Sequence, residues 1–366
     1  MKRFTMLIGI DANEANIRNR VGSNVYAFEV LRQLYRWGSK HQFLIYLNAA
    51  PLADLPKPKE NWQYRILRPG FFWTQWRLPL DLLVHRPRPD VFLTLGHYAP
   101  RLAPMPTMIC IMDLAFLKFP DSFLKKDLYK LTAWTKYSVK QAKHIFAISQ
   151  ATKTDIINSY GVSGNKISVA YPGVDRFKSI GERPAKGQYL LYVGTLQPRK
   201  NIEALITAFT SEVGKFSPRR WIRLIIAGKT GWRYKIKPAP HVKYLGYVPQ
   251  DRLAGLIKGS QGLVLPSLYE GFGIPVVQAM SLGVPVLVSR NSSLTEIVGD
   301  CGLYIEPPFD APAIRVGLNQ LLLLTLAQKQ ALIAKAKLRS RQFSWPKTAK
   351  TILARINGKI EGDDSN

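Results

Sequence analysis

Short apolar runs alternate along the chain with longer stretches in which apolar residues recur every three or four positions. Runs of four or five Val, Ile, Leu and aromatic residues without polar alternation are typical of strands that are buried on both faces of a parallel sheet. The longer stretches at 24–37, 201–209 and 275–282 predict helices between such strands. The expected strands lie at 6–10, 43–47, 91–94, 107–111, 144–148 and 166–169, and again at 189–193, 223–227, 242–245, 262–265 and 285–289.

The alternation of strands and helices occurs twice, on either side of a polar segment with Gly and Pro at 179–187. The 366 residues also exceed the roughly 250–300 at which a single hydrophobic core stops growing. Such alternation forms parallel sheets with helices on both faces, and ligands bind outside the carboxyl ends of the strands. We therefore expect an α/β protein of two doubly wound, Rossmann-like domains, 1–178 and 179–345, that face a cleft.

Composition excludes several classes of protein. Hydrophobic residues make up 46% and charged residues 21%, which is typical of a folded chain and not of a disordered or collagen-like one. No apolar run reaches the roughly 18–20 residues that span a bilayer, and the apolar start lacks a signal-peptide cleavage pattern, so we expect a cytoplasmic protein. Cys110 and Cys301 are far apart and lack metal-ligand spacing, so each is expected to be a buried thiol.

Net charge is the unusual feature of this composition. The chain has 52 basic against 24 acidic residues, which gives +28, divided equally between residues 1–180 and 181–366. Such a surface attracts anionic lipid, nucleic acid or polyphosphate. No zinc-finger, RNP or basic-zipper motif accompanies the charge, so a specific nucleic-acid partner is not expected. The favoured partner is the anionic inner face of a cell membrane, to which the protein would bind peripherally.

The segment 266–275, PSLYEGFGIP, carries the strongest candidate chemistry. It joins a predicted strand to a predicted helix that begins at Pro275, and its two glycines allow close approach to the backbone. The start of a helix offers unpaired N–H groups and a partial positive charge, so this loop is suited to a phosphate. Glu270 would then face whatever the phosphate carries. The alternative is a tight turn with a solvated Glu270.

Several blocks of sequence resemble, in order and over nearly the whole chain, those of family 4 glycosyltransferases. The blocks are PDVFLTLGHYAP, DLAFLKFPDSF, AISQATKTDI, YPGVD, LLYVGTLQPRKNI, IIAGKTGW, YLGYVPQDRL, EGFGIPVVQAMSLGVPVLVS, SSLTEIVGDCGLYIEP and FSWPKTAKTIL. The resemblance implies the GT-B fold, with a last helix at about 346–360 that crosses back to the first domain. It also implies a retaining hexosyltransferase that uses a nucleotide sugar, and the PRKN loop favours a mannose-like donor.

The resemblance also implies roles for individual residues. Arg199 and Lys200 would neutralise the leaving diphosphate, whereas the sequence alone also allows an exposed cationic turn. Glu270 matches the first carboxylate of the family's Glu-x7-Glu motif and would contact the hydroxyls of the donor sugar. The remaining donor-binding positions are Gly22, in place of the family's glycine-rich loop, then Gly271, the backbone amides of Phe272 and Gly273, and Gln278.

Two positions depart from the family pattern. The second glutamate of the motif, which holds the ribose, is Gln278 in this chain, and its amide would bind the nucleoside more weakly or differently. Many relatives carry a histidine beside the donor sugar where this chain has Met112, and a thioether donates no proton. Asp113 follows and would either orient the acceptor or cap the end of a strand. These losses leave one alternative function, a catalytically degenerate scaffold or binding subunit.

The remaining expectations concern the cofactor, the acceptor and the catalytic route. No Asp-x-Asp triplet occurs, so we expect neither metal nor cofactor, with a GDP- or UDP-linked sugar as substrate. The leaving phosphate would take the acceptor's proton in a front-face displacement. His97 and Tyr98 are candidates for the acceptor site or for plain packing. The aromatic segment 71–77 is a candidate for a lipid interface, with core packing of at least Trp76 and Leu78 as the alternative. The expected product is a cell-surface glycan such as lipopolysaccharide, built on a saccharide or lipid-linked acceptor.

Overall fold

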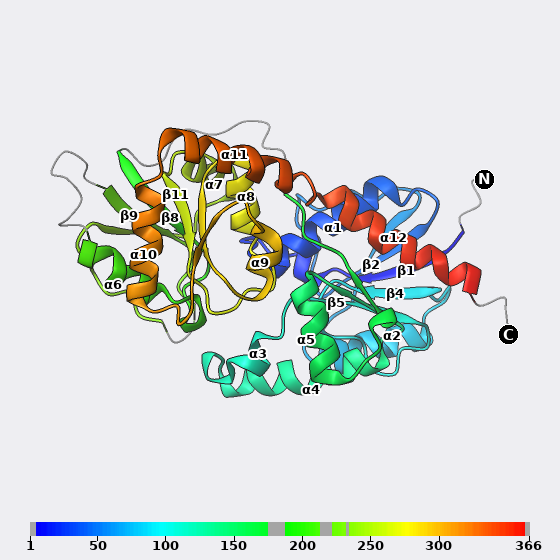
Figure 1. Cartoon of the computed structure of the whole chain (residues 1–366). Coiled ribbons are helices and arrows are strands. Elements are labelled where there is room, and N and C mark those ends of the chain that lie inside the picture. Colours follow the sequence, from blue (N-terminus) through cyan, green and yellow to red (C-terminus); the bar gives the residue numbers. More distant parts are fainter. Residues whose placement is uncertain (1–4, 175–186, 213–221, 232–233, 363–366) are drawn as a thin grey trace. The chain divides into compact units, whose positions relative to one another are not determined.

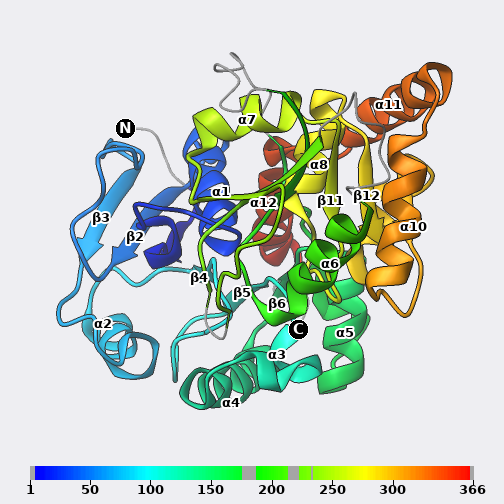
Figure 2. The same cartoon turned by 90° about the vertical axis from the view of Figure 1, so that its left-hand side faces the viewer.

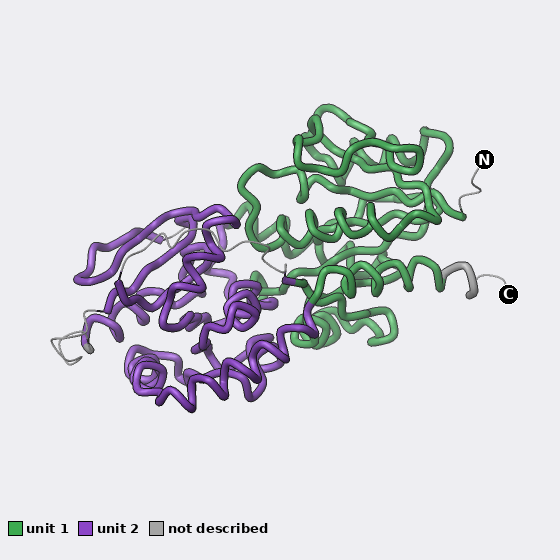
Figure 3. The backbone as a smooth tube through the Cα atoms, turned by 90° about the horizontal axis from the view of Figure 1, so that it is seen from above, with its two compact units in different colours: residues 1–117, 125–173, 344–366 green, residues 118–124, 174–343 purple. Residues whose placement is uncertain are grey.

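The computed structural model describes residues 5–174, 187–212, 222–231 and 234–362 (Figure 1). The chain forms two compact units: unit 1 comprises residues 1–117, 125–173 and 344–366, and unit 2 comprises residues 118–124 and 174–343 (Figure 3). The predicted boundary between residues 178 and 179 falls outside the described residues. No helix within the described ranges combines the length and the apolar character needed to cross a bilayer.

Unit 1 is built on a seven-stranded parallel sheet in the order β3-β2-β1-β4-β5-β6-β7. Its inner strands are mainly apolar because helices cover both faces (Figure 1), and all five residues of β5 are buried. The strands are β1 (Leu7–Asp11), β2 (Gln42–Leu47), β3 (Trp62–Ile66), β4 (Val91–Thr94), β5 (Thr107–Ile111), β6 (His144–Ala147) and β7 (Ile167–Val169). The helices are α1 (Ser23–Trp37), α2 (Leu78–Val84), α4 (Lys125–Gln141), α5 (Gln150–Tyr160) and α12 (Trp345–Gly362), and α3 (Ala115–Lys118) leads out of the unit.

The last helix, α12, packs against α1 within unit 1. The ring of Trp345 meets that of Tyr26 edge-on, with 6.0 Å between centroids. Thr348 Oγ1 donates to the carbonyl of Tyr171 at 2.5 Å, and Tyr26 Oη donates to that of Ala170 at 3.3 Å. These contacts hold α12 and the segment that follows β7 against α1. The last described helix is therefore part of unit 1.

Unit 2 is built on a six-stranded parallel sheet in the order β10-β9-β8-β11-β12-β13. The prediction of two doubly wound parallel sheets is thereby confirmed. The strands are β8 (Gln188–Val193), β9 (Ile222–Ala227), β10 (Val242–Gly246), β11 (Gly262–Leu265), β12 (Val286–Ser289) and β13 (Leu303–Ile305). The helices are α6 (Ile202–Glu212), α7 (Gln250–Lys258), α8 (Ile274–Leu282), α9 (Ser292–Val298), α10 (Ala311–Leu322) and α11 (Leu326–Ser340).

A short piece of the first half of the chain, residues 118–124, belongs to unit 2. Lys118 Nζ lies 4.8 Å from the centroid of the Tyr269 ring, and the ring of Phe119 lies 6.2 Å from the same ring. Cation–π and aromatic contacts of this kind are favourable at partly buried sites. They hold this piece beside the loop that precedes α8, a feature that the hydrophobic pattern does not indicate.

Candidate functional site

The two loops that the sequence singles out begin at the same edge of the sheet in unit 2. They follow β8 and β11, which are parallel neighbours, and the carboxyl ends of parallel strands point the same way. The loop after β8 leads through a short 3-10 turn, Pro198–Lys200, and the loop after β11 leads into α8. The backbone N–H of Leu268 donates to the carbonyl of Arg199 at 2.9 Å, so the two loops are joined.

A buried ion pair lies at the centre of this edge. Lys200 Nζ is 2.6 Å from Glu270 Oε1, and each residue is only 8% exposed. Ser267 Oγ donates to the same carboxylate oxygen at 2.7 Å. A charge-assisted bond of this length is strong where little water screens it, whereas either charge alone would be costly to bury. The alternatives of an exposed cationic turn and a solvated Glu270 are therefore wrong.

Arg199 lies beside the pair with its guanidinium only partly engaged. Nη1 donates to the carbonyl of Tyr269 at 3.0 Å, while Nε is buried and has no hydrogen-bond partner among the described residues. A buried donor without a partner costs on the order of 1–3 kcal/mol, which an incoming oxygen atom would recover. Two cationic side chains and an unused N–H therefore meet at this edge, an arrangement suited to a phosphate group.

The start of α8 lies directly after Glu270 and supplies backbone donors. Gly273 caps the helix with a φ of +98°, and a Cβ there would lie 2.9 Å from Leu294 Cδ2, so conformation and space both require glycine. The first helical residue is Ile274, so the predicted start at Pro275 is one residue late. Gly271 and Phe272 are buried, and the ring of Phe272 packs edge-on against Phe343 at 5.4 Å. The side chain of Phe272 thus serves packing, and its backbone remains the candidate ligand.

Gln278 lies in the second turn of α8 and is 4% exposed. A carboxylate at this position would be favoured by the partial positive charge of the helix start, but the carboxamide carries no charge. It can still accept one set of hydrogen bonds and donate another. Gln278 therefore lies on α8, the helix that follows the loop with Glu270, and its side chain can still form hydrogen bonds.

Residues at the start of α9 complete the site, and sequence reasoning assigned them no role. Asn291 Nδ2 donates to the carbonyls of Ser267 and Leu268 at 3.1 and 2.9 Å. Ser292 Oγ accepts a hydrogen bond from the backbone N–H of Glu270 at 3.0 Å. Ser293 Oγ donates to the backbone carbonyl of Glu270 at 2.9 Å. These bonds hold the backbone of the loop on both sides of Glu270. The signal in the sequence is the run of small polar residues 291–293, which begins two residues after the end of β12, the neighbour of β11.

The candidates from the first half of the chain lie in unit 1. Gly22 is exposed and caps the start of α1, and Asp113 follows β5. Asp113 Oδ1 accepts the backbone N–H of Ala115, the first residue of α3, at 2.9 Å, so this carboxylate oxygen caps the start of that short helix and not the strand. The structure therefore brings Arg199, Lys200 and Glu270 together in one unit and places Gly22 and Asp113 in the other.

His97 is hydrogen-bonded to the backbone at Met112. Its Nε2 accepts the backbone N–H of Met112 at 3.1 Å. Because Nε2 accepts a hydrogen bond it carries no hydrogen, so the ring hydrogen lies on Nδ1. Burial also lowers the pKa of His97, which favours this neutral form. Nδ1 is buried and unpaired within the described part of the chain. Tyr98 instead packs edge-on against Trp134 at 5.4 Å, and burial raises the pKa of Tyr98 to about 12. His97 therefore offers a donor to a ligand, whereas Tyr98 serves packing.

A buried carboxylate ends β1 in unit 1, and sequence reasoning gave it no role. Asp11 Oδ2 accepts the indole N–H of Trp73 at 2.8 Å, and Oδ1 accepts from the side chain of Asn13 at 2.8 Å. Burial raises the pKa of Asp11 to about 6, although these bonds oppose the shift. Asp11 thus places a carboxyl group with a raised pKa at the carboxyl edge of the sheet.

Asp11 should make the free energy of unfolding fall as the pH rises from about 4 to about 6. The pKa of the folded state lies above the ordinary value of 3.8, so in this window the folded chain retains a proton that the unfolded chain has lost. The stability of Asp11→Asn relative to the parent should therefore increase over the window, by at most about 2–3 kcal/mol. Urea unfolding of both proteins at a series of pH values measures this difference, and a difference that does not change with pH would contradict the assignment.

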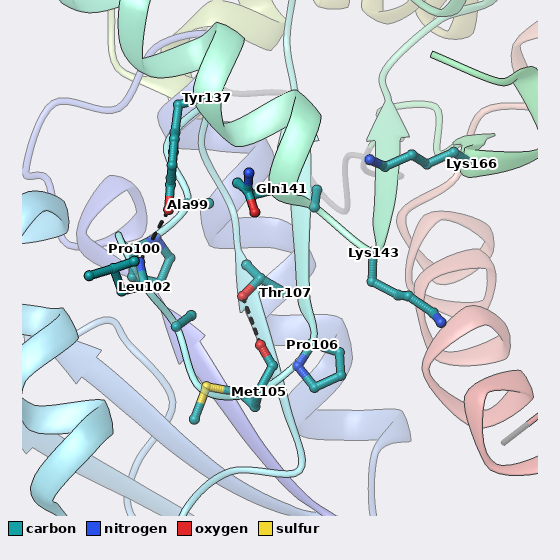
Figure 4. Close-up of a pocket in the computed structure, with 12 residues that line it drawn as sticks. Ala99, Pro100, Leu102, Met105, Pro106, Thr107, Tyr137, Gln141, Lys143 and Lys166 are labelled. Carbon is teal, nitrogen blue, oxygen red and sulfur yellow. Dashed lines mark hydrogen bonds between the residues drawn. The ribbon is translucent and has the colours of Figure 1, made fainter.

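A hollow on unit 1 lies at the opposite ends of the strands (Figure 4). Its lining includes Thr107 at the start of β5, Lys143 just before β6 and Lys166 just before β7. Tyr137 Oη accepts the backbone N–H of Leu102 at 3.2 Å, and Lys166 Nζ donates to two carbonyl groups in the last turn of α4. The amino ends of parallel strands are not where such sheets bind ligands, so this hollow is not part of the candidate site.

Two family models match the chain. The model described as Glycosyl transferases group 1 matches residues 174–339, and Glycosyltransferase Family 4 matches residues 21–176. O-antigen chain mannosyltransferase B of Escherichia coli is 30% identical over 263 residues, which cover 66% of this chain and 68% of that protein. O-antigen chain mannosyltransferase RfbU of Salmonella typhimurium is 30% identical over 250 residues, with the same shares of 66% and 68%. Among solved structures, sucrose-phosphate synthase from Thermosynechococcus elongatus aligns over 98% of this chain and 100% of its own, with a TM-score of 0.76 and 15% identity.

Proposed function

Because the chain belongs to the family 4, group 1 glycosyltransferases and has their GT-B fold, we propose that it transfers a mannose-like hexose from a GDP- or UDP-linked sugar to a saccharide acceptor, with retention of configuration. It is a glycosyltransferase, and the choice of mannose is supported by the two O-antigen mannosyltransferases that it resembles. The observation that carries the mechanism is the buried Lys200–Glu270 pair beside Arg199 and the start of α8.

The donor side of the mechanism follows from the charges at this edge. As the bond to the sugar breaks, negative charge accumulates on the leaving diphosphate, and the cations of Arg199 and Lys200 would stabilise it. The unpaired Nε–H of Arg199 and the backbone N–H groups of Gly271, Phe272 and Gly273 would add hydrogen bonds. The Glu270 carboxylate would accept hydrogen bonds from the sugar hydroxyls, and Gln278 would hold the ribose. These groups provide the electrostatic stabilisation, so we propose that neither a metal nor a cofactor takes part.

The acceptor side is proposed to lie in unit 1. His97 Nδ1 would donate to an acceptor hydroxyl, and Asp113 would orient the same group with its second carboxylate oxygen. The leaving phosphate would take the acceptor's proton in a front-face displacement. A saccharide on a lipid carrier or lipopolysaccharide is the proposed acceptor, because the resembling proteins are O-antigen enzymes. Such an acceptor would place the protein at the inner face of the cell membrane.

The alternative of a degenerate scaffold is not favoured. Relatives that share 30% identity over 263 and 250 residues are transferases by name. In this chain Lys200 and Glu270 are joined directly and held by residues from three loops, as an active site requires. A protein that had lost catalysis would have no need to keep a buried charge pair, which is costly to assemble.

Binding of nucleotide sugars tests the proposed function, and Gln278→Glu sharpens the test. A ligand at a hundred times its dissociation constant stabilises the folded state by about 2.7 kcal/mol, which raises the melting temperature by several degrees. We expect GDP-mannose or a UDP-sugar to do so in thermal unfolding. Gln278→Glu should tighten binding by about tenfold, because a carboxylate accepts stronger hydrogen bonds from a ribose diol than an amide does.

The controls separate an active pocket from a decayed one. ADP-sugars reveal binding that does not depend on the base. Free mannose reveals binding that does not depend on the diphosphate. A response of Gln278→Glu alone, with none in the parent, would show a decayed pocket and restore the scaffold interpretation. The absence of any response from either protein, with both folded, would contradict the proposed function.

A further inference from the structure

An exposed apolar surface lies on unit 1 between β3 and β4. Six large apolar side chains in the segment 71–84 are between 41% and 71% exposed. The segment consists of a π-helical turn, Trp73–Arg77, followed by α2, which runs along the rim of the unit near β3 (Figure 2). Isolated exposed apolar residues are common, but a cluster of this size marks a binding surface. We call this cluster the α2 surface; its members are Phe71, Phe72, Trp76, Leu80, Leu83 and Val84.

The exposed side chains are displayed by a segment that is firmly fixed from beneath. Leu78 and Leu82, on the inner side of α2, are fully buried, and Trp73 donates its indole N–H to Asp11 at 2.8 Å. Arg65 on β3 holds Asp81 on α2 through two bonds of 2.7 and 2.6 Å. The exposure of the outer side chains is therefore a property of the fold and does not result from fraying of a short helix. The alternative of core packing for Trp76 and Leu78 is confirmed for Leu78 and wrong for Trp76, which is 56% exposed.

The backbone at the start of the α2 surface supports a functional role. Phe72 has a φ of +48°, a left-handed conformation that is unfavourable for a bulky residue. Its ring meets that of Phe71 edge-on, with 4.5 Å between centroids, and both rings remain exposed. Strain of this kind persists where the displayed side chains have a function. Here it holds two aromatic rings together on the solvent side of the chain.

The positive charge around the α2 surface indicates what binds there. Four arginines that border the α2 surface form no ion pair with an acid in the described part of the chain. Asp81, the one acid within residues 65–88, is buried and bound to Arg65. Aromatic rings and arginine stems favour the boundary between lipid headgroups and acyl chains, and arginines bind anionic headgroups. A protein partner would need a matching acidic and apolar surface. The four arginines are Arg68, Arg77, Arg86 and Arg88.

We propose that the α2 surface docks the protein onto an anionic lipid bilayer, with its aromatic and aliphatic side chains in the headgroup region and its arginines on anionic headgroups. This inference rests on the proposed membrane location and specifies the surface responsible for it. The surface lies on the unit to which we assign the acceptor, so docking would present that unit to lipid-linked saccharides.

Vesicle co-sedimentation of the full chain tests the proposal. We expect binding to vesicles of phosphatidylcholine with about a third phosphatidylglycerol, weak binding to phosphatidylcholine alone, and a decrease with added salt. Trp76→Ser/Val84→Ser should weaken partitioning to the anionic vesicles at least tenfold, and Arg86→Gln/Arg88→Gln should do so by a similar factor. Melting temperatures confirm that each variant is folded.

Matched controls lie on unit 2. Val316→Ser/Leu323→Ser removes two apolar side chains of comparable exposure. Lys235→Gln/Lys243→Gln removes two positive charges, the same number as Arg86→Gln/Arg88→Gln, from exposed positions. Both controls should bind vesicles like the parent. The proposal is overturned if the parent does not bind, if the α2-surface variants bind like the parent, or if both controls lose binding equally. It is also overturned if the parent dimerises in sedimentation analysis and the Trp76 variant does not.

The outcome is independent of the proposed function. Binding of a nucleotide sugar, measured by thermal unfolding without vesicles, should be the same in the α2-surface variants and in the parent. Loss of vesicle binding with a normal nucleotide response would leave the transferase function intact. Vesicle binding by a parent that responds to no nucleotide sugar would support the docking surface and contradict the proposed donor chemistry.

Discussion

Glu270→Gln should lower the rate of sugar transfer by about a hundredfold or more, the size of effect seen when one preorganised polar group is removed from an active site. The variant keeps the shape of the side chain but leaves the ammonium of Lys200 buried without its counter-charge. Removal of one partner of a buried pair costs on the order of 3–5 kcal/mol, so stability should fall as well. Initial rates at saturating donor and urea unfolding measure the two effects separately.

The double variant Lys200→Met/Glu270→Gln distinguishes a catalytic pair from a structural one. It removes both charges, so no uncompensated charge remains, and most of the lost stability should return. Activity should not return, because the leaving diphosphate would still lack its cation and the sugar its carboxylate. Recovery of transfer together with stability would show that the pair only supports the fold, and a rate for Glu270→Gln within a few-fold of the parent would have the same meaning.

The inner strands were predictable from the sequence because they are buried on both faces. β4, β5 and β11 have the bounds expected from their uninterrupted apolar runs. The two strands that were missed, β3 and β13, lie at the edges of their sheets. β3 mixes polar with apolar residues, since one of its sides lacks a neighbouring strand, and β13 has only three residues. The other two edge strands, β7 and β10, were predicted at 166–169 and 242–245, so edge position alone does not prevent prediction.

The buried face of α1 could be predicted only in part. The sequence period of this helix predicts one apolar face made of Val25, Phe28, Leu31, Leu34 and Tyr35. Leu31 and Leu34 are fully buried as predicted, but the other three are only partly buried, and Tyr26 and Val30, which the prediction left out, are buried instead. The reason is α12, which comes from the far end of the chain and covers a side of α1 that a single-helix pattern treats as exposed. A helix that packs against two neighbours has a wider apolar face than its own sequence period suggests.

The identity of the site residues could be predicted from the sequence, but the contacts between them could not. Resemblance to a family placed Lys200 and Glu270 at the donor, but 70 residues separate them, and only the pairing of β8 with β11 brings them into contact. The serines that hold the Glu270 backbone follow a third strand, β12, and no local pattern links them to the site. The unpaired Nδ1–H of His97 likewise follows from a contact between distant residues, because the backbone N–H of Met112, just after β5, occupies the other ring nitrogen.

Gly228→Ala should be the most destabilising single substitution in the neighbourhood of the site. Gly228 follows β9 with a φ of +157°, and a Cβ there would lie 1.8 Å from the carbonyl oxygen of Gly194, which begins the loop to Lys200. No rotamer change relieves a clash with backbone, so the ends of β8 and β9 must separate. We expect a loss of about 3–5 kcal/mol, which is in the range for backbone strain combined with overpacking. Urea unfolding measures it, and the transfer rate should fall because Arg199 and Lys200 move with the loop.

Gly246→Ala is the matched control for this expectation. Gly246 also has a positive φ, +66°, and its carbonyl accepts the backbone N–H of Gly228 at 2.7 Å, so both glycines belong to one hydrogen-bonded edge. They differ in space, because a Cβ on Gly246 would meet no atom within 4 Å. Alanine there should cost only the conformational strain, about 1–2 kcal/mol. Equal losses from the two substitutions would mean that strain alone governs this edge and that the close approach of Gly228 to Gly194 is relieved elsewhere. A loss at Gly228 that exceeds the loss at Gly246 by about 2 kcal/mol or more would show that the packing of two strand ends holds the cationic loop in place.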